Sequence, residues 1–250
     1  MSEEAAFEGV MVLVLAVNET QSLRRTVLAL EEILPPEDAK KIIIYYPPRV
    51  TAGCRAVIRE LAARRFPIPV WPEPQASADN AQSLMQVFRK QKDVSHVMLW
   101  ASDGEVAPEK AALLLRAAKE NPQAFVKFSR MMKGGRQPAG KSLLLQARDR
   151  AFCLLARARL GANVTDALFF GHALFPLAPF GSYCLTEAGT GVIIEILGLF
   201  SRLGTQFIEF PVRAMRRAEA KSNITLKQKF HILSFLLCSG GAAKTREAAR

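Results

Sequence analysis

The stretch His96–Lys110, HVMLWASDGEVAPEK, constrains the fold of this chain more than any other part of the sequence. It begins with the apolar run Val97–Trp100, and a run this short without polar alternation predicts a strand buried on both faces. Small and acidic residues end the strand, and Pro108 and Glu109 predict the first turn of a helix that continues over Ala111–Lys119. A strand, an acidic turn and a helix in this order indicate one unit of a parallel α/β sheet, in which ligands bind beyond the carboxyl ends of the strands.

The acidic turn carries two carboxylates, Asp103 and Glu105, one residue apart. Hard oxygen ligands beside a phosphate suit Mg²⁺ or Mn²⁺, which would bridge the protein and a nucleotide diphosphate. The turn therefore predicts a divalent metal site at Asp103 and Glu105. The alternative is a simple strand-to-helix junction whose polar residues face water.

Apolar runs and helical repeats alternate along the rest of the chain. Further strands are predicted at Val10–Val17, Ile42–Tyr46, Ile68–Trp71, Phe125–Ser129 and Gln206–Val212, and the segment Thr165–Phe175 is apolar and β-prone. Helices are predicted through Leu23, Val27 and Leu30, and over Gly53–Arg65, Ser77–Lys90, Leu143–Leu160, Gly189–Leu203 and Lys227–Leu237. This alternation predicts a mainly parallel central sheet flanked by helices, in an α/β fold. We expect one domain over residues 1–238 and a flexible basic tail over 239–250.

The composition favours some partners and excludes others. The net charge of +11 suits an anionic membrane surface, phosphorylated substrates or nucleic acid. No zinc finger, RNA-binding aromatic motif or basic leucine zipper is present, so no nucleic-acid partner is expected. The N-terminus is acidic, unlike a signal peptide, and the apolar runs are too short to span a bilayer. Four scattered cysteines favour reduced thiols in the cytoplasm.

Five segments resemble, in the right order, those of one known enzyme family. They are VLAVNET (Val14–Thr20), ASDGEVAPEK (Ala101–Lys110), VKFSRMMKGG (Val126–Gly135), VTDALFFGHALF (Val164–Phe175) and GTQFIEFPVRAMRRAEAKSN (Gly204–Asn223). The family is the family 2 glycosyltransferases with the GT-A fold, in the branch that makes polyprenyl-phosphate sugars such as dolichyl-phosphate mannose. The resemblance implies a GT-A (Rossmann-like) sheet and transfer of a sugar from a nucleotide-diphosphate sugar to a polyprenyl phosphate.

The resemblance also implies roles for individual residues. Asp103 and Arg130 would be catalytic, and Asp103 and Glu105 would hold Mg²⁺ or Mn²⁺. The residues implied to bind the nucleotide or phosphates are Asn18, Glu19, Tyr46, Ser102, His172, Arg217, Lys221 and Ser222. The acceptor phosphate is already ionised, so the barrier lies mainly in charge developing on the leaving diphosphate, which a metal and basic side chains stabilise. A lipid acceptor implies a cytoplasmic protein at the membrane face, bound to the membrane surface or to a membrane-anchored partner protein.

Several of these residues have an equally simple structural interpretation. Asn18 and Glu19 are also suited to capping the next helix. A buried histidine at position 172 and a surface arginine at position 130 are ordinary features of a folded chain. Arg217, Lys221 and Ser222 are also typical of a solvated charge run.

The chain departs from the family at several positions, and this leaves two further functions open. Ala101 replaces the first acid of the Asp-x-Asp segment, Tyr45–Pro48 stands where the family has Asp-Asp, and His172 replaces an arginine. One alternative is therefore a non-catalytic GT-A domain that serves as a binding or assembly partner. The other is a soluble glycosyltransferase with a saccharide or protein acceptor, which would need a general base, for which Asp166 or Glu187 are the candidates. Guanine and uracil nucleotides are equally compatible with the sequence.

Overall fold

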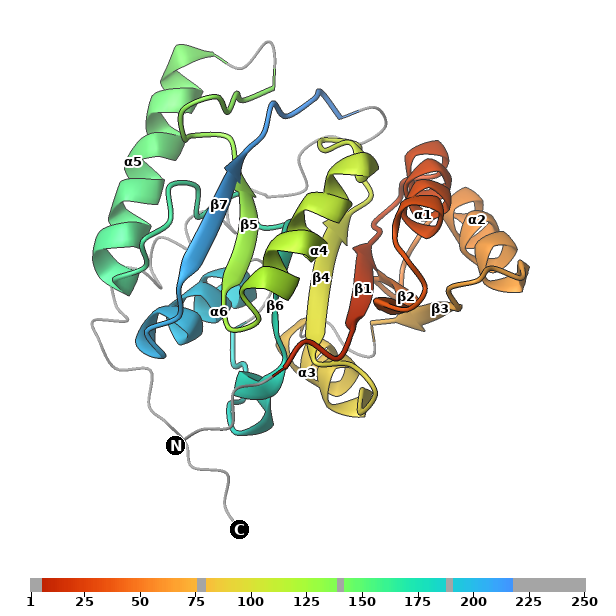
Figure 1. Ribbon diagram of the computed structural model, residues 1–250. Helices are drawn as coiled ribbons and strands as arrows, with labels where there is room; N and C mark the ends of the chain where they lie inside the picture. The colour runs from red at the N-terminus through yellow and green to blue at the C-terminus, as the bar shows by residue number, and fades with distance from the viewer. Residues whose placement is uncertain (1–5, 76–79, 139–141, 188–190, 218–250) are drawn as a thin grey trace.

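A computed structural model of the chain describes residues 6–75, 80–138, 142–187 and 191–217, and one seven-stranded sheet runs through it (Figure 1). The strands are β1 (Val10–Leu15), β2 (Ala39–Tyr46), β3 (Val70–Pro74), β4 (His96–Ala101), β5 (Phe125–Ser129), β6 (His172–Pro176) and β7 (Phe207–Pro211). Their order in the sheet is β3-β2-β1-β4-β6-β5-β7. Only β6 runs against its neighbours, so the predicted mainly parallel sheet is confirmed.

Helices cover both faces of this sheet and make three layers (Figure 1). They are α1 (Gln21–Ile33), α2 (Ala52–Ala63), α3 (Asn80–Lys90), α4 (Ala111–Glu120), α5 (Leu143–Leu160) and α6 (Gly191–Arg202), with short 3₁₀ turns η1 (Pro108–Lys110) and η2 (Ala178–Gly181). One core cluster joins the sheet to α1, α2 and α4, and a second joins it to α3, α5 and α6.

The continuous apolar runs of the central strands follow from this double coverage. In β1, Val12 and Val14 face the cluster beneath α1, while Met11 and Leu13 face the opposite cluster, and all four are fully buried. Alternate residues of a strand point to opposite faces, so a strand covered on both sides needs apolar residues at every position.

The β-prone segment Thr165–Phe175 forms a strand only from His172 onward, because the side chain of Glu209 binds its first residues. The backbone N–H of Thr165 donates to Glu209 Oε2 at 2.6 Å, and its hydroxyl donates to the same oxygen at 2.8 Å. These bonds fix a turn ahead of β6, which starts only at His172. The predicted helix Lys227–Leu237 and the boundary between residues 238 and 239 lie outside the described residues.

His172, at the start of β6, is buried between aromatic rings. Its ring centroid lies 4.8 Å from that of Trp100 and 5.3 Å from that of Phe169. Neither ring nitrogen has a hydrogen-bond partner among the described residues, and burial lowers the pKa of His172 to about 4. The imidazole is therefore neutral at pH 7 in the folded protein.

We expect this histidine to destabilise the fold in mild acid. The unfolded chain takes up the proton near pH 6.5 and the folded chain only near pH 4, so stability is lost as the pH falls between these values. Between pH 7 and pH 5 the wild type should lose about 2 kcal/mol more of its free energy of unfolding than His172→Phe does. Urea denaturation of both proteins at the two pH values measures the difference. An equal loss of the free energy of unfolding in the wild type and in His172→Phe would contradict the prediction.

Candidate functional site

The topology brings the predicted site residues to one edge of the sheet. Strands β1, β2, β4, β5 and β7 are parallel in direction, so their carboxyl ends meet at this edge, and the antiparallel β6 begins there (Figure 1). The described residues gathered near it are Asn18, Glu19, Tyr46, Ser102, Asp103, Glu105, Arg130, His172 and Arg217. Two further predicted residues, Lys221 and Ser222, lie outside the described part of the chain.

The acidic turn after β4 holds its two carboxylates in a fixed geometry. Gly104 between them has φ +75°, a left-handed conformation that glycine adopts without strain. The carboxylate of Asp103 accepts the backbone N–H of Glu105 at 3.0 Å, which closes the turn. The two side chains are only 10% and 11% exposed, so they form a nearly enclosed carboxylate pair.

Arg217 completes this cluster from a distant part of the sequence. After β7 the backbone N–H of Met215 donates to the carbonyl of Glu105 at 2.9 Å, which lays the segment beside the acidic turn. Arg217 Nε then lies 3.1 Å from Asp103 Oδ2 and 3.0 Å from Glu105 Oε1. Burial and the charge of Asp103 raise the pKa of Glu105, while Arg217 acts to lower it.

The carboxylate pair offers part of a divalent-metal site. Two hard oxygen ligands converge on one cationic atom, and Mg²⁺ or Mn²⁺ bound by one or two carboxylates takes its remaining ligands from water and substrate phosphates. Within the described ranges, no group of three or more His, Cys, Asp or Glu side chains is placed to hold a metal. An ion at the pair would therefore take its remaining ligands from water or from a phosphate, and it would displace Arg217.

Arg130, the other predicted catalytic residue, is held in a buried ion pair. Its Nε and Nη2 donate to the two oxygens of Asp166 at 2.8 and 3.1 Å, and its guanidinium lies 4.4 Å from the centroid of the Phe169 ring. Burial would raise the pKa of Asp166, but the hydrogen bond from Arg130 holds it below its usual value. Asp166 is fully buried, so in this conformation it is unavailable as a general base.

Glu19 and Ser102 are occupied by bonds within the sheet edge. The Glu19 carboxylate accepts the backbone N–H groups of Val17 and Asn18 at 2.6 and 3.0 Å, and it is 2% exposed. The Ser102 hydroxyl is fully buried and donates to the carbonyl of Leu15 at 3.0 Å. Side chains this enclosed do not reach a ligand in this conformation.

The remaining predicted ligand contacts divide in the same way. Asn18 Oδ1 accepts the backbone N–H of Thr51, the residue that caps α2, so its interaction is structural. His172 is 1% exposed and neutral, so in this conformation its ring offers neither access nor charge to a phosphate. Tyr46 is half-buried at the end of β2, where its ring packs against the core cluster beneath α1.

A buried lysine next to the site was missed from the sequence. Lys127 in β5 is fully buried, and its ammonium donates to the carbonyls of Asp166 and Phe128 at 2.7 and 3.0 Å. It also lies 3.3 Å from Glu209 in β7. The signal was a charged residue inside each of two apolar strands, which suggests a pair across neighbouring strands.

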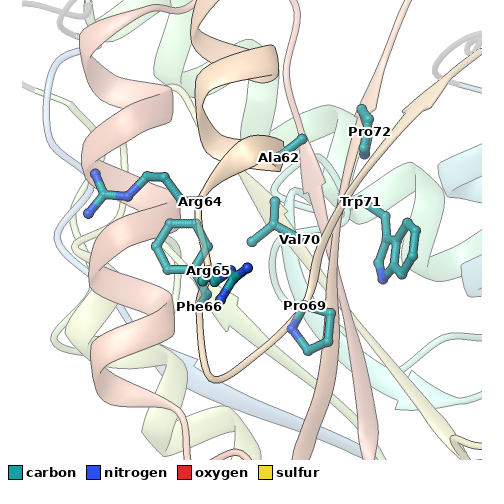
Figure 2. A pocket seen from close by; sticks show the side chains of 8 residues that line it. All are labelled: Ala62, Arg64, Arg65, Phe66, Pro69, Val70, Trp71 and Pro72. Atoms are coloured by element: carbon teal, nitrogen blue, oxygen red, sulfur yellow. The ribbon is translucent and has the colours of Figure 1, made fainter.

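A shallow pocket of about 600 Å³ lies elsewhere, where α2 leads into β3. Figure 2 shows the side chains that line it, Ala62, Arg64, Arg65, Phe66, Pro69, Val70, Trp71 and Pro72. This is the amino end of β3, away from the sheet edge that carries the carboxylate pair. The pocket is therefore separate from the candidate site.

No protein-family model matches the chain, and no curated protein matches it in sequence. Solved structures do match in fold. A mycobacterial protein aligns over 95% of this chain and 76% of its own, with a TM-score of 0.68 and 15% identity. Glucosyl-3-phosphoglycerate synthase from Mycobacterium tuberculosis aligns over 95% of this chain and 82% of its own, with TM-scores of 0.65 in complex with UDP (15% identity) and 0.66 with Mn²⁺, UDP-glucose and glycerol 3-phosphate (16% identity). The likeness establishes the predicted GT-A fold.

The buried ion pair gives a test of the site's stability. Asp166→Asn keeps the shape of the side chain but leaves the Arg130 guanidinium buried without its counter-charge, so we expect a loss of about 3 kcal/mol or more in the free energy of unfolding. Urea denaturation measures it. Glu60→Gln, which breaks the exposed pair with Arg24, should cost much less, and equal losses in the two variants would contradict the assignment.

Proposed function

We propose that this chain is a glycosyltransferase that moves a sugar from a nucleotide-diphosphate sugar to a phosphate-bearing acceptor, with a polyprenyl phosphate as the acceptor. The observation that carries the proposal is the cluster of Asp103, Glu105 and Arg217 at the carboxyl edge of a GT-A sheet. Ligands of parallel α/β sheets bind at this edge. The resemblance of five sequence segments to family 2 glycosyltransferases, and the UDP-glucose bound by a fold neighbour, support the same class.

The state of Asp166 favours a phosphate acceptor over a sugar hydroxyl. A hydroxyl nucleophile needs a general base, and both oxygens of Asp166 are bound by Arg130. A phosphate acceptor is already ionised near neutral pH and needs no base. The second candidate base, Glu187, precedes α6 and receives no support from the described site.

The site's cations would act on the leaving diphosphate. Negative charge develops there as the bond to the sugar breaks, and preorganised positive charge stabilises it. Arg217 is the best candidate among them, because it contacts the carboxylate pair and its side chain is 25% exposed, so that it can reach a ligand. When bound at Asp103 and Glu105, Mg²⁺ or Mn²⁺ would supply Lewis-acid stabilisation of the same diphosphate.

Nucleotide binding tests the proposal. We expect calorimetric titration to detect either a UDP-sugar or a GDP-sugar in the presence of Mn²⁺, and Asp103→Asn to weaken that binding about tenfold by removing one of two carboxylates. Asp93→Asn, the same change at a carboxylate outside the site, is the matched control. Transfer of labelled sugar to a short-chain polyprenyl phosphate then tests the acceptor.

A non-catalytic GT-A partner protein is the second candidate function. Arg217 already neutralises part of the carboxylate pair, and Ala101 and the Tyr45–Pro48 segment lack the acids of the related enzymes. A well-folded sample that binds no UDP-sugar or GDP-sugar, with or without Mn²⁺, would favour this function over the enzyme.

Helix α5 supports a lipid acceptor, because its outer face is apolar with a basic border. Figure 1 shows α5 at an outer edge of the molecule. At helical spacing one face carries Leu143, Leu144, Ala147, Ala151, Leu154 and Ala158. Leu143, Leu144 and Leu154 are 83%, 80% and 67% exposed. Arginines flank this stripe on both sides, at positions 148, 150, 157 and 159.

This pattern fits an anionic membrane surface better than a second copy of the chain. An apolar stripe with a basic border is typical of helices that lie in the membrane interface. The only acid of α5, Asp149, is 6% exposed, so two copies packed through this face would set arginines against arginines. Separately, none of the helices in the described ranges is long and apolar enough to cross a bilayer.

Vesicle binding tests the α5 face. At low salt the protein should sediment with vesicles that contain phosphatidylglycerol and release them at high salt, since screening weakens surface attraction. The double variant Leu144→Glu and Leu154→Glu should bind at least about tenfold more weakly, because it loses apolar burial and adds repulsion. Leu203→Glu is the control, at a leucine 57% exposed outside α5.

Two results would contradict this assignment. Equal vesicle binding by the wild type and the double variant would show that α5 is not the contact. Self-association that the same double variant abolishes, seen by analytical ultracentrifugation in the absence of vesicles, would assign the face to a second copy instead.

A further inference from the structure

Arg217 contacts one oxygen of each carboxylate that would hold a divalent cation. Its Nε contacts Asp103 Oδ2 at 3.1 Å and Glu105 Oε1 at 3.0 Å. A guanidinium and a divalent ion both bind carboxylate oxygens, and the two cannot occupy one position together. The structure therefore shows the site with its own side chain as the cation.

The charge balance of this arrangement is unfavourable for a diphosphate. With both acids ionised, Asp103, Glu105 and Arg217 together carry one negative charge, which repels an incoming anion. A divalent ion in place of the guanidinium would neutralise the pair. It would also release the positive charge of Arg217. The bound metal would then no longer leave a net negative charge to repel the diphosphate, and the diphosphate would bind the released guanidinium.

The side chain of Arg217 is held by fewer contacts than that of Arg130. Arg217 holds both acids through Nε alone, is 25% exposed, and its terminal nitrogens donate to no residue in the described part of the chain. Arg130 is 8% exposed, binds both oxygens of Asp166 and lies over the Phe169 ring. Displacing Arg217 breaks two contacts at a partly exposed position. Displacing Arg130 would leave the carboxylate of Asp166 buried without its counter-charge.

We propose that Arg217 is exchanged for a divalent cation at Asp103 and Glu105, and that the released guanidinium binds the diphosphate of the donor. Metal and nucleotide sugar then bind cooperatively, because each removes an obstacle to the other. Arg217 thus acts first as a placeholder for the ion and afterwards as a bidentate phosphate ligand. This inference rests on the proposed function, since it takes the second ligand to be a nucleoside diphosphate.

The test compares Arg217→Gln with Arg216→Gln in the full-length protein. Both variants remove one positive charge, and Arg216 is an exposed neighbour without a described partner in the carboxylate pair. Electron paramagnetic resonance of free Mn²⁺ gives the metal affinity without nucleotide, and calorimetry gives the affinity for UDP or GDP with saturating Mn²⁺. We expect Arg217→Gln to bind Mn²⁺ about tenfold more tightly and the nucleotide about tenfold more weakly, with Arg216→Gln close to wild type.

The opposite signs of the two effects make the proposal refutable. Equal Mn²⁺ affinities in the wild type and Arg217→Gln would overturn the exchange even if nucleotides bind. Nucleotide binding that is unchanged by EDTA and lost in Arg217→Gln would overturn it too, because the arginine would then replace the ion permanently. The Mn²⁺ affinities can change as expected while none of the three proteins binds UDP or GDP. In that case the proposed enzymatic function fails, and with it the part of the inference that concerns the diphosphate.

Discussion

The burial of the two central strands, β1 and β4, is the constraint on which the rest of the structure depends. Both are covered by helices on each face, so apart from His96 at the start of β4 their side chains are apolar, and polar side chains collect beyond the carboxyl ends of the strands. A buried parallel pair has its hydrogen bonds satisfied within the sheet, but the residues beyond it must find other partners. The acidic turn after β4 and the Glu19 carboxylate after β1 are therefore adjacent for structural reasons before any ligand is considered.

Charge at this edge is organised in two layers of different rigidity. The inner layer consists of Lys127, Glu209, Arg130 and Asp166, which are buried and bonded to one another or to backbone carbonyls. Removing one partner from such a set leaves a buried charge without its counter-charge, which costs free energy, so these residues are held in place. The outer layer, in which Arg217 meets the carboxylate pair, is partly open to water. Of the two layers, the outer one is therefore where a cation is held less firmly.

The sequence alone predicts most of the helices and strands, but it does not predict which distant side chains contact one another. Helix α5 and strand β5 have the predicted limits, because an amphipathic repeat and a continuous apolar run are local signals. The edge that carries the site also followed from the alternation of strands and helices. The contact of Arg217 with Glu105 spans 112 residues and depends on where the segment after β7 crosses the sheet edge. Likewise, no local pattern showed that Arg130 would be bound by Asp166 rather than exposed.

These contacts change what the missing acids of the chain mean. A GT-A domain that had merely lost its metal ligands would be expected to leave a solvated gap at the sheet edge, yet here two carboxylates remain, nearly enclosed, and hold a cation. Burial, and after it the neighbouring charge of Asp103, raise the pKa of Glu105, so two ionised carboxylates in this enclosed position cost free energy. If the arginine were only a structural partner, a single acid would satisfy it at lower cost. A second acid is useful when the site must also attract a doubly charged ion, so the pair itself argues for a site that still exchanges cations.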